Sequence, residues 1–193
     1  MTNQKTIWII NQYAGSSVHG MEYRHYYLAK EFIAKGHKVV IISGSYSHLH
    51  KLEPTTNGTF TSEEIEGITY CWVKVPKYDR SISLGRFKNM MAFAWNLRKL
   101  PLDDFPKPDA IIVSSPSLFP IVTARKWATI FKAKLLFEIR DIWPLTLQEL
   151  GNLSNFHPLI LFMRWFERYG YKKSDFVVSL FNNPLLSICS KVI

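Results

Sequence analysis

Ile7-Trp-Ile-Ile10 is followed by a helical pattern over Met21–Lys35 and then by Val39-Val-Ile-Ile42. Both short runs are continuously apolar and rich in β-branched residues, as expected of parallel strands that are buried on both faces. Gly36 follows the helical pattern at the place where a glycine commonly ends a helix. A strand, a helix and a second strand in this order predict a βαβ unit and a parallel sheet.

The same alternation continues along the rest of the chain. Further strands are expected at Ile68–Val75, Ala110–Val113, Leu135–Ile139 and Phe176–Leu180, and further helices at Arg86–Leu100, Ser117–Phe131 and Pro158–Tyr171. We therefore expect one α/β domain of the Rossmann-like, doubly wound type, with a mainly parallel sheet and helices on both faces. The segment Ser45–Glu66 breaks the pattern and is expected to be a long loop that ends in a hairpin to the strand at Ile68.

Composition fits one globular domain. The 193 residues are 47% hydrophobic and 20% charged, values typical of a folded protein. The aromatic fraction of 15% leaves two readings open, a core rich in Phe and Trp or a surface that faces a membrane. The net charge of +9 suits an acidic partner such as anionic lipid or a phosphorylated substrate. Nucleic acid is not expected, because no helix-turn-helix, zinc or RNP-type motif is present.

Cysteine usage and hydropathy favour a cytoplasmic protein, either soluble or peripheral on the inner face of the cytoplasmic membrane. Cys71 and Cys189 have neither a disulfide framework nor a metal-ligand spacing. The apolar run after Lys5 is too short for a signal peptide. The run Leu159–Phe166 is interrupted by Arg164 and is far shorter than the roughly 18 residues of a membrane-spanning helix.

The first candidate site follows the first strand and contains Gly15, Ser16, Gly20, Glu22 and Arg24. Ligands bind open α/β sheets at the carboxyl ends of the strands, and a loop that enters a helix offers backbone N–H groups to a phosphate. No Lys-Ser/Thr pair follows the second glycine, and the spacing is not G-x-G-x-x-G, which argues against a P-loop and a nicotinamide enzyme. The alternative is an ordinary turn in which glycine supplies backbone freedom.

Two later strands end in further candidates. Ser115 belongs to Ser114-Ser-Pro-Ser117, in which Ser117 is expected to cap the next helix through its hydroxyl. Glu138-Ile-Arg140-Asp141 ends an otherwise apolar strand. Alternation puts Glu138 and Arg140 on one face, with Asp141 at the lip. The carboxylate of Asp141 is the catalytic candidate, because it could accept a proton from a hydroxyl nucleophile. The alternative is a structural ion pair with Arg140.

Three stretches resemble the N-terminal domain of family 4 glycosyltransferases. They are Ile9-Ile-Asn-Gln-Tyr-Ala-Gly15, Gly20-Met-Glu-Tyr-Arg24 and Glu138-Ile-Arg-Asp-Ile-Trp-Pro-Leu-Thr-Leu-Gln-Glu-Leu-Gly151. The resemblance runs from Ile7 to about Ser179 and is greatest to the branch that adds N-acetylated amino-deoxysugars, such as L-fucosamine, in O-antigen, lipopolysaccharide and capsule assembly. It implies one half of a GT-B architecture, in which two Rossmann-like domains face each other across a cleft.

The resemblance also implies an activity. Such enzymes transfer a sugar from a nucleotide sugar to a glycan or polyprenyl-diphosphate-linked acceptor, with retention of configuration and without a metal or other cofactor. The N-terminal domain binds mainly the acceptor and the C-terminal domain mainly the donor. By this resemblance, the loop Gly15–Gly20 would face the donor phosphates, and Asp141 would lie near the reacting sugar.

Length sets a limit on this expectation, because two domains of ordinary size do not fit in 193 residues. We expect residues 1–181 to form the acceptor-side domain and residues 182–193 to be the atypical tail of a truncated or frameshifted product. The C-terminal donor-binding domain would be absent and the chain alone inactive. The alternative is a non-catalytic acceptor-binding or assembly subunit that works with a separate C-terminal half.

The predicted helix Arg86–Leu100 carries a basic and aromatic pattern. The cations of the helix are Arg86, Lys88, Arg98 and Lys99, and Arg80 precedes it. Its large apolar residues are Phe87, Met90, Met91 and Trp95. A basic, aromatic, amphipathic helix suits an anionic membrane surface, where a polyprenyl-linked acceptor would reside. The alternative is a core-facing stripe whose basic face is solvated.

Overall fold

The computed structural model describes residues 4–20, 22–79, 84–140 and 154–180. Asp141, Arg80 and the tail 182–193 lie outside these residues. The described strands are β1 Thr6–Ile10, β2 Lys38–Gly44, β3 Phe60–Ile65, β4 Ile68–Val73, β5 Ala110–Ser114, β6 Lys134–Ile139 and β7 Phe176–Ser179. The described helices are α1 Arg24–Ala34, α2 Leu84–Leu97, α3 Pro120–Phe131 and α5 Pro158–Lys173, with a 3-10 turn at Leu102–Asp104. No helix in this described part is long and apolar enough to cross a membrane.

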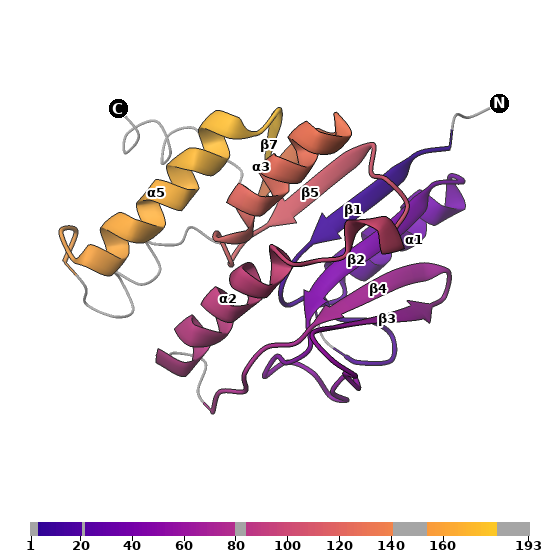
Figure 1. Cartoon of the computed structure of the whole chain (residues 1–193), viewed down its shortest axis with the longest axis horizontal. Helices are drawn as coiled ribbons and strands as arrows, with labels where there is room; N and C mark the ends of the chain where they lie inside the picture. The colour runs from indigo at the N-terminus through magenta and orange to yellow at the C-terminus, as the bar shows by residue number, and fades with distance from the viewer. Residues whose placement is uncertain (1–3, 21, 80–83, 141–153, 181–193) are drawn as a thin grey trace.

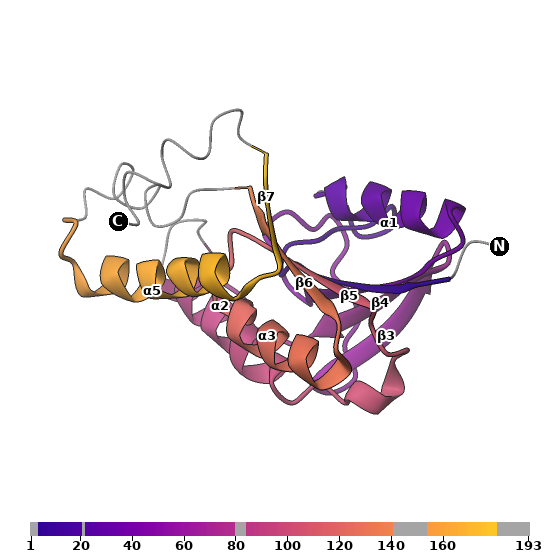
Figure 2. The ribbon, with the colours of Figure 1, turned by 90° about the horizontal axis from the view of Figure 1, so that it is seen from above.

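The strands form one sheet in the order β3-β4-β2-β1-β5-β6-β7. All neighbouring pairs are parallel except β3 with β4. Helix α1 covers one face, and α2, α3 and α5 cover the other (Figures 1 and 2). The strand order reverses between β1 and β5, so the carboxyl ends of these two strands form the switch point at which ligands bind folds of this class. The predicted doubly wound fold, with helices on both faces, is confirmed.

Strand β3 lies inside the segment expected to be mostly loop. It pairs antiparallel with β4 through a turn at Glu66 and Gly67, both with positive φ, so the predicted hairpin is present and the loop is shorter than expected. The strand was hard to recognise because Thr61-Ser-Glu-Glu64 is polar. Such residues are typical of an edge strand, where they oppose pairing with other chains.

Two helices begin later than predicted. Helix α3 starts at Pro120, whose fixed φ and missing N–H suit the first turn. Its cap position is Phe119, without a side-chain hydrogen bond, so the prediction that Ser117 caps this helix was wrong. Helix α1 starts at Arg24, since Glu22 has a φ of 74° and cannot belong to a right-handed helix.

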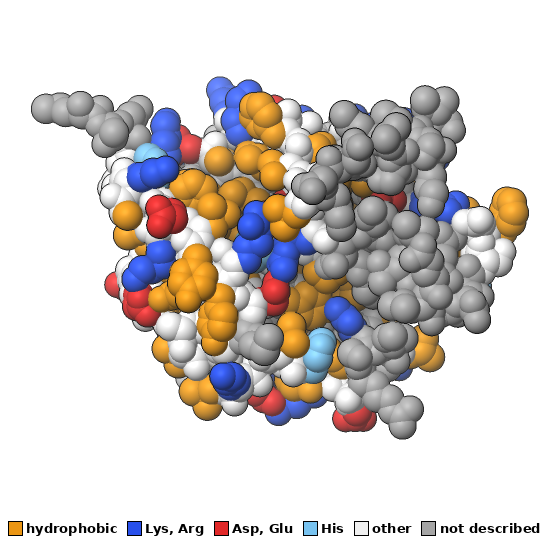
Figure 3. Space-filling model, turned by 180° about the vertical axis from the view of Figure 1, so that it is seen from behind, with side chains coloured by type: hydrophobic (Ala, Val, Ile, Leu, Met, Phe, Trp, Pro, Cys, Tyr) orange, Lys and Arg blue, Asp and Glu red, His pale blue; other side chains and the backbone are white. Residues whose placement is uncertain are grey.

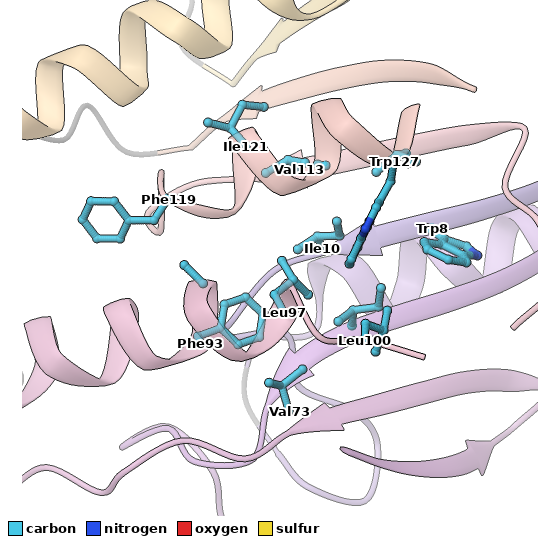
Figure 4. Packing of buried hydrophobic residues seen from close by; sticks show 14 of the residues in the cluster. Trp8, Ile10, Val73, Phe93, Leu97, Leu100, Val113, Phe119, Ile121 and Trp127 are labelled. Atoms are coloured by element: carbon cyan, nitrogen blue, oxygen red, sulfur yellow. The ribbon is translucent and has the colours of Figure 1, made fainter. Parts of the chain in front are cut away.

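The larger core lies between the sheet and the layer of α2 and α3 (Figure 4). Trp8 of β1 is fully buried there and meets the rings of Phe105, Trp127 and Phe131 edge-on, with centroids 5.7 to 6.1 Å away. Its indole N–H donates to the carbonyl of Pro106 at 2.9 Å. Much of the high aromatic content is therefore core, as one of the two readings proposed.

Candidate functional site

Polar residues that follow β1 and β5 connect the ends of the two strands at the switch point. Asn11 comes directly after β1, and its Nδ2 donates to the carbonyl of Ser115, just past β5, at 3.3 Å. The Asn11 Oδ1 accepts from the backbone N–H of Tyr13 at 2.8 Å. Asn11 and Ser115 are both buried. They hold the two strand ends together and, because they are buried, do not offer open ligand contacts.

Glu138, near the carboxyl end of β6, is the centre of a buried polar cluster. Its Oε1 accepts from Arg24 Nε and Nη2 at 3.0 and 2.7 Å. Its Oε2 accepts from Ser114 Oγ at 2.6 Å and lies 3.0 Å from His25 Nε2. The glutamate and histidine side chains are buried, whereas the Arg24 side chain is 41% exposed. The cluster thus presents one cation at the surface and holds the rest inside.

These contacts determine the ionisation of Glu138. Burial alone would raise its pKa, but the hydrogen bonds from His25, Ser114 and Arg24 outweigh burial and lower the pKa to about 2. The carboxylate is therefore charged at every physiological pH. A permanently charged carboxylate is poorly suited to general acid or base catalysis. Glu138 instead orients Arg24 and His25.

Arg140 follows β6 and reaches the same segment before α1. Its guanidinium pairs with the carboxylate of Glu22, and its backbone N–H donates to Ser115 Oγ at 2.8 Å. The predicted common face of Glu138 and Arg140 is confirmed, since both side chains contact the segment Glu22–His25. Figure 3 shows Lys and Arg side chains gathered near the centre of the face that carries α1, beside an acidic side chain.

The glycine-containing loop is closed on itself. The N–H groups of Gly15, Ser16 and Gly20 donate to the carbonyls of Glu22, Gly20 and Ser16, at 3.0 to 3.2 Å. A Cβ at Gly20, where φ is +94°, would lie 2.9 Å from Lys51 Cγ. The close approach and the positive φ both require glycine there. In this conformation these three N–H groups are not available to a phosphate, which favours the structural alternative.

A contact with the β3–β4 hairpin holds this loop. His19 is buried, and its two ring nitrogens lie 2.9 Å from the Leu52 carbonyl oxygen and 2.9 Å from Glu63 Oε2. The same glutamate oxygen accepts from Trp72 Nε1 at 2.7 Å. Sequence reasoning missed this cluster, because the partners are far apart in the chain and β3 was expected to be loop.

Of the predicted site residues, the structure brings together Glu22, Arg24, Ser115, Glu138 and Arg140 at the carboxyl ends of β5 and β6. Gly15, Ser16 and Gly20 belong to the neighbouring loop. Asp141, the catalytic candidate, lies outside the described residues. Sequence reasoning missed His25 and Ser114, and the available signal was a polar residue inside each buried element. Among the described residues, no three His, Cys, Asp or Glu side chains are grouped to hold a metal ion.

A doubly wound sheet whose polar cluster lies beside the switch point defines a Rossmann-like ligand-binding domain. The chain belongs to the family of glycosyl transferase 4-like domains, whose model matches residues 19–182. A search among curated proteins found no match. The predicted family is thereby confirmed at the level of the domain.

Three solved structures with a similar fold are glycosyltransferases of the GT-B type. They include sucrose-phosphate synthase from Thermosynechococcus elongatus, with a TM-score of 0.64 and 11% identity over 98% of this chain and 45% of that one. UGT89C1 from Arabidopsis thaliana, complexed with quercetin, has a TM-score of 0.56 and 12% identity; the match covers 99% of this chain and 48% of that one.

The catalytic domain of starch synthase IV from Arabidopsis thaliana, bound to ADP and acarbose, has a TM-score of 0.53 and 16% identity; the match covers 72% of this chain and 34% of that one. The chain thus spans less than half the length of each of these three structures. At these identities the likeness concerns the fold alone, and it covers less than half of each of the three structures.

Proposed function

We propose that this chain is the acceptor-side domain of a glycosyltransferase and works with a donor-binding domain on the other side of a cleft. The observation that carries the proposal is the Arg24–Glu138 cluster at the carboxyl ends of β5 and β6. It holds a partly exposed guanidinium at the edge where ligands of this fold bind. A guanidinium in a fixed orientation suits a phosphate or carboxylate group of a ligand.

The finer parts of the proposal are supported by the sequence motifs. The donor is a nucleotide sugar of the amino-deoxysugar type, such as an L-fucosamine donor, and transfer retains configuration without a metal. The acceptor is a glycan carried on a polyprenyl diphosphate, in O-antigen or capsule assembly. The protein then works at the inner face of the cytoplasmic membrane, and the net charge of +9 suits an anionic surface there.

Asp141 is proposed to act near the reacting sugar, because it follows Arg140 directly in the motif Glu138-Ile-Arg-Asp. In an enzyme that contains both domains, Asp141→Asn is expected to lower kcat by at least about 100-fold while the unfolding temperature stays unchanged. A fall in unfolding temperature with little loss of turnover would assign Asp141 a structural ion pair instead.

The test of the proposal is a binding experiment on the purified protein. An acceptor analogue that carries a diphosphate is expected to bind, and the nucleotide sugar is expected to bind weakly, because its site is on the other domain. Transfer is expected when the acceptor-side domain and a donor-binding domain are both present. Tight binding of the nucleotide sugar together with no binding of the acceptor would contradict the proposal.

The second candidate is a non-catalytic acceptor-binding subunit, in which the partly exposed guanidinium of Arg24 holds the acceptor and the protein takes no part in sugar transfer. The two candidates differ in one measurement. Mixing the protein with a donor-binding half restores sugar transfer in the first case, whereas in the second case acceptor binding is unchanged and no sugar moves.

A further inference from the structure

A groove of about 650 Å³ lies on the outer side of the helical layer, between α2, α3 and α5. It is lined mainly by apolar residues, several of them aromatic, such as Trp95 of α2 and Trp165 and Phe166 of α5. We call it the aromatic–basic groove. These helices cover the face of the sheet opposite α1, so the groove is separate from the Arg24–Glu138 cluster.

The rim of the groove exposes unusually large apolar side chains. Trp95 is 58% exposed and Trp165 is 54% exposed. Phe162, which is 41% exposed, continues the patch, since its ring centroid lies 5.0 Å from that of Phe166. A continuous patch of exposed aromatic residues marks a surface that is covered in function. Tryptophan in particular is enriched at the membrane–water interface, where its ring sits at headgroup level.

The charged residues that line the groove are all basic. Arg98, Lys99 and Lys126 contribute to its lining, and none of the described lining residues is acidic. The guanidinium of Arg98 lies over the Trp95 ring, 4.8 Å from its centroid. Long cationic side chains can cover apolar surface while their heads reach outward. The occupant must therefore be apolar with an anionic border.

We propose that the aromatic–basic groove docks the protein on an anionic phospholipid bilayer. Trp95 and Trp165 enter the headgroup layer, and Arg98, Lys99 and Lys126 contact lipid phosphates.

This inference deepens the proposed function, since it rests on an acceptor held in the membrane and names the surface that reaches it. The groove itself is independent of sugar transfer. Its test therefore measures membrane binding first and transfer second, so that either can fail without the other.

The experiment is co-sedimentation of the purified protein with vesicles at low salt. Vesicles of equal parts phosphatidylcholine and phosphatidylglycerol are expected to bring the protein into the pellet, and vesicles of phosphatidylcholine alone are expected to leave most of it in solution. Lys99→Gln and Lys126→Gln should each weaken partitioning roughly fivefold. The double variant Trp95→Ser, Trp165→Ser should abolish sedimentation.

Matched controls lie on α1 (Tyr27) and at its C-cap (Lys35), on the opposite face of the sheet. Lys35→Gln removes an exposed cation, and Tyr27→Ser removes an aromatic side chain that is 62% exposed. Both are expected to sediment like the wild type. All variants are first compared by thermal unfolding, so that a loss of binding is not a loss of fold.

Three results would overturn the inference. The wild type stays in solution with anionic vesicles; or the α1 variants lose binding while the groove variants keep it; or the tryptophan double variant converts a dimer to a monomer, which would make a second copy the occupant. If, with a donor-binding domain present, the groove variants transfer sugar to a water-soluble acceptor but not to a vesicle-borne one, both proposals hold. If neither the wild type nor any variant transfers sugar in the presence of a donor-binding domain, but vesicle binding follows the groove, only the proposed function fails.

Discussion

Arg24, at the first residue of α1, donates from Nε and Nη2 to a single oxygen of Glu138 on β6, 114 residues later in the chain, at 3.0 and 2.7 Å. The pair ties the start of the helix that covers one face of the sheet to the carboxyl end of a strand beyond the switch point. It is the contact around which the candidate site is built. The buried carboxylate of Glu138 fixes the position of the partly exposed guanidinium of Arg24.

Glu138→Gln should destabilise the fold at neutral pH by about 3 kcal/mol, because its pKa falls from an ordinary 4.5 to about 2 on folding. A lowered pKa stabilises the folded state at pH values above 4.5. This contribution is lost as the pH falls through that value toward 2. Urea unfolding of wild type and variant should therefore differ most at pH 7 and converge near pH 2. Glu31→Gln, at an exposed position of α1, is the control and should show no such convergence.

Arg24→Gln should affect ligand binding more than stability. The Arg24 side chain is 41% exposed, and Glu138 keeps His25 and Ser114 as partners, so the loss of stability should be about 1 kcal/mol. Affinity for an acceptor that carries a diphosphate should fall at least about tenfold, since a charge-assisted contact is lost. Lys30→Gln is the matched control. Lys30 is also a cation of α1 that pairs with a glutamate, but its partner is Glu66, away from the Arg24–Glu138 cluster. Equal losses of affinity in the two variants would show that Arg24 has no special role.

The fold could be predicted from the sequence where burial and periodicity agree. Ile7–Ile10 and Val39–Ile42 were recognisable because a strand buried on both faces is apolar at every position. Phe60–Ile65 was not, because an edge strand with one open side tolerates Ser62 and Glu63. The start of α1 was misplaced because the left-handed φ of Glu22 leaves no trace in hydropathy.

The site was predictable only in part, for a similar reason. Alternation along β6 was enough to place Glu138 and Arg140 on one face. Their partners were not predictable as partners, because Ser114 and His25 approach Glu138 through the pairing of β5 with β6 and the packing of α1. The glycine loop was expected to offer free N–H groups, and only the hydrogen bonds within it show how Gly15 and Gly20 are used.

Cys71 should be inert in the folded protein. The side chain is fully buried in β4, and burial, with a smaller effect of Asp104, raises its pKa to about 12. At pH 8 only about one thiol in ten thousand would then be ionised. In a Cys189→Ser background, Ellman's reagent should react with no thiol in buffer and with one in guanidinium chloride. Rapid labelling of the native protein would instead indicate that β4 opens frequently.

Gly170→Ala should destabilise the protein although it replaces glycine within a helix. Alanine in a helix interior is favoured over glycine by about 1 kcal/mol. A Cβ at Gly170 of α5, however, would lie 2.8 Å from Cε1 and 2.9 Å from Cδ1 of Phe137, whose ring is fully packed in the core. Overpacking of this kind costs about 1 to 3 kcal/mol, so the net effect should be a loss of about 1 kcal/mol.

A double-mutant cycle tests this cause directly. Phe137→Leu removes the ring that the new methyl group meets, so Gly170→Ala should cost less in that background than in the wild type. Lys172→Ala, at an exposed position near the end of the same helix, is the control for propensity alone and should be close to neutral. Urea denaturation with an unchanged slope gives the four free energies of unfolding. A stabilising Gly170→Ala would mean that α5 moves away from the sheet at low cost, and the aromatic–basic groove would then be a deformable surface rather than a fixed one.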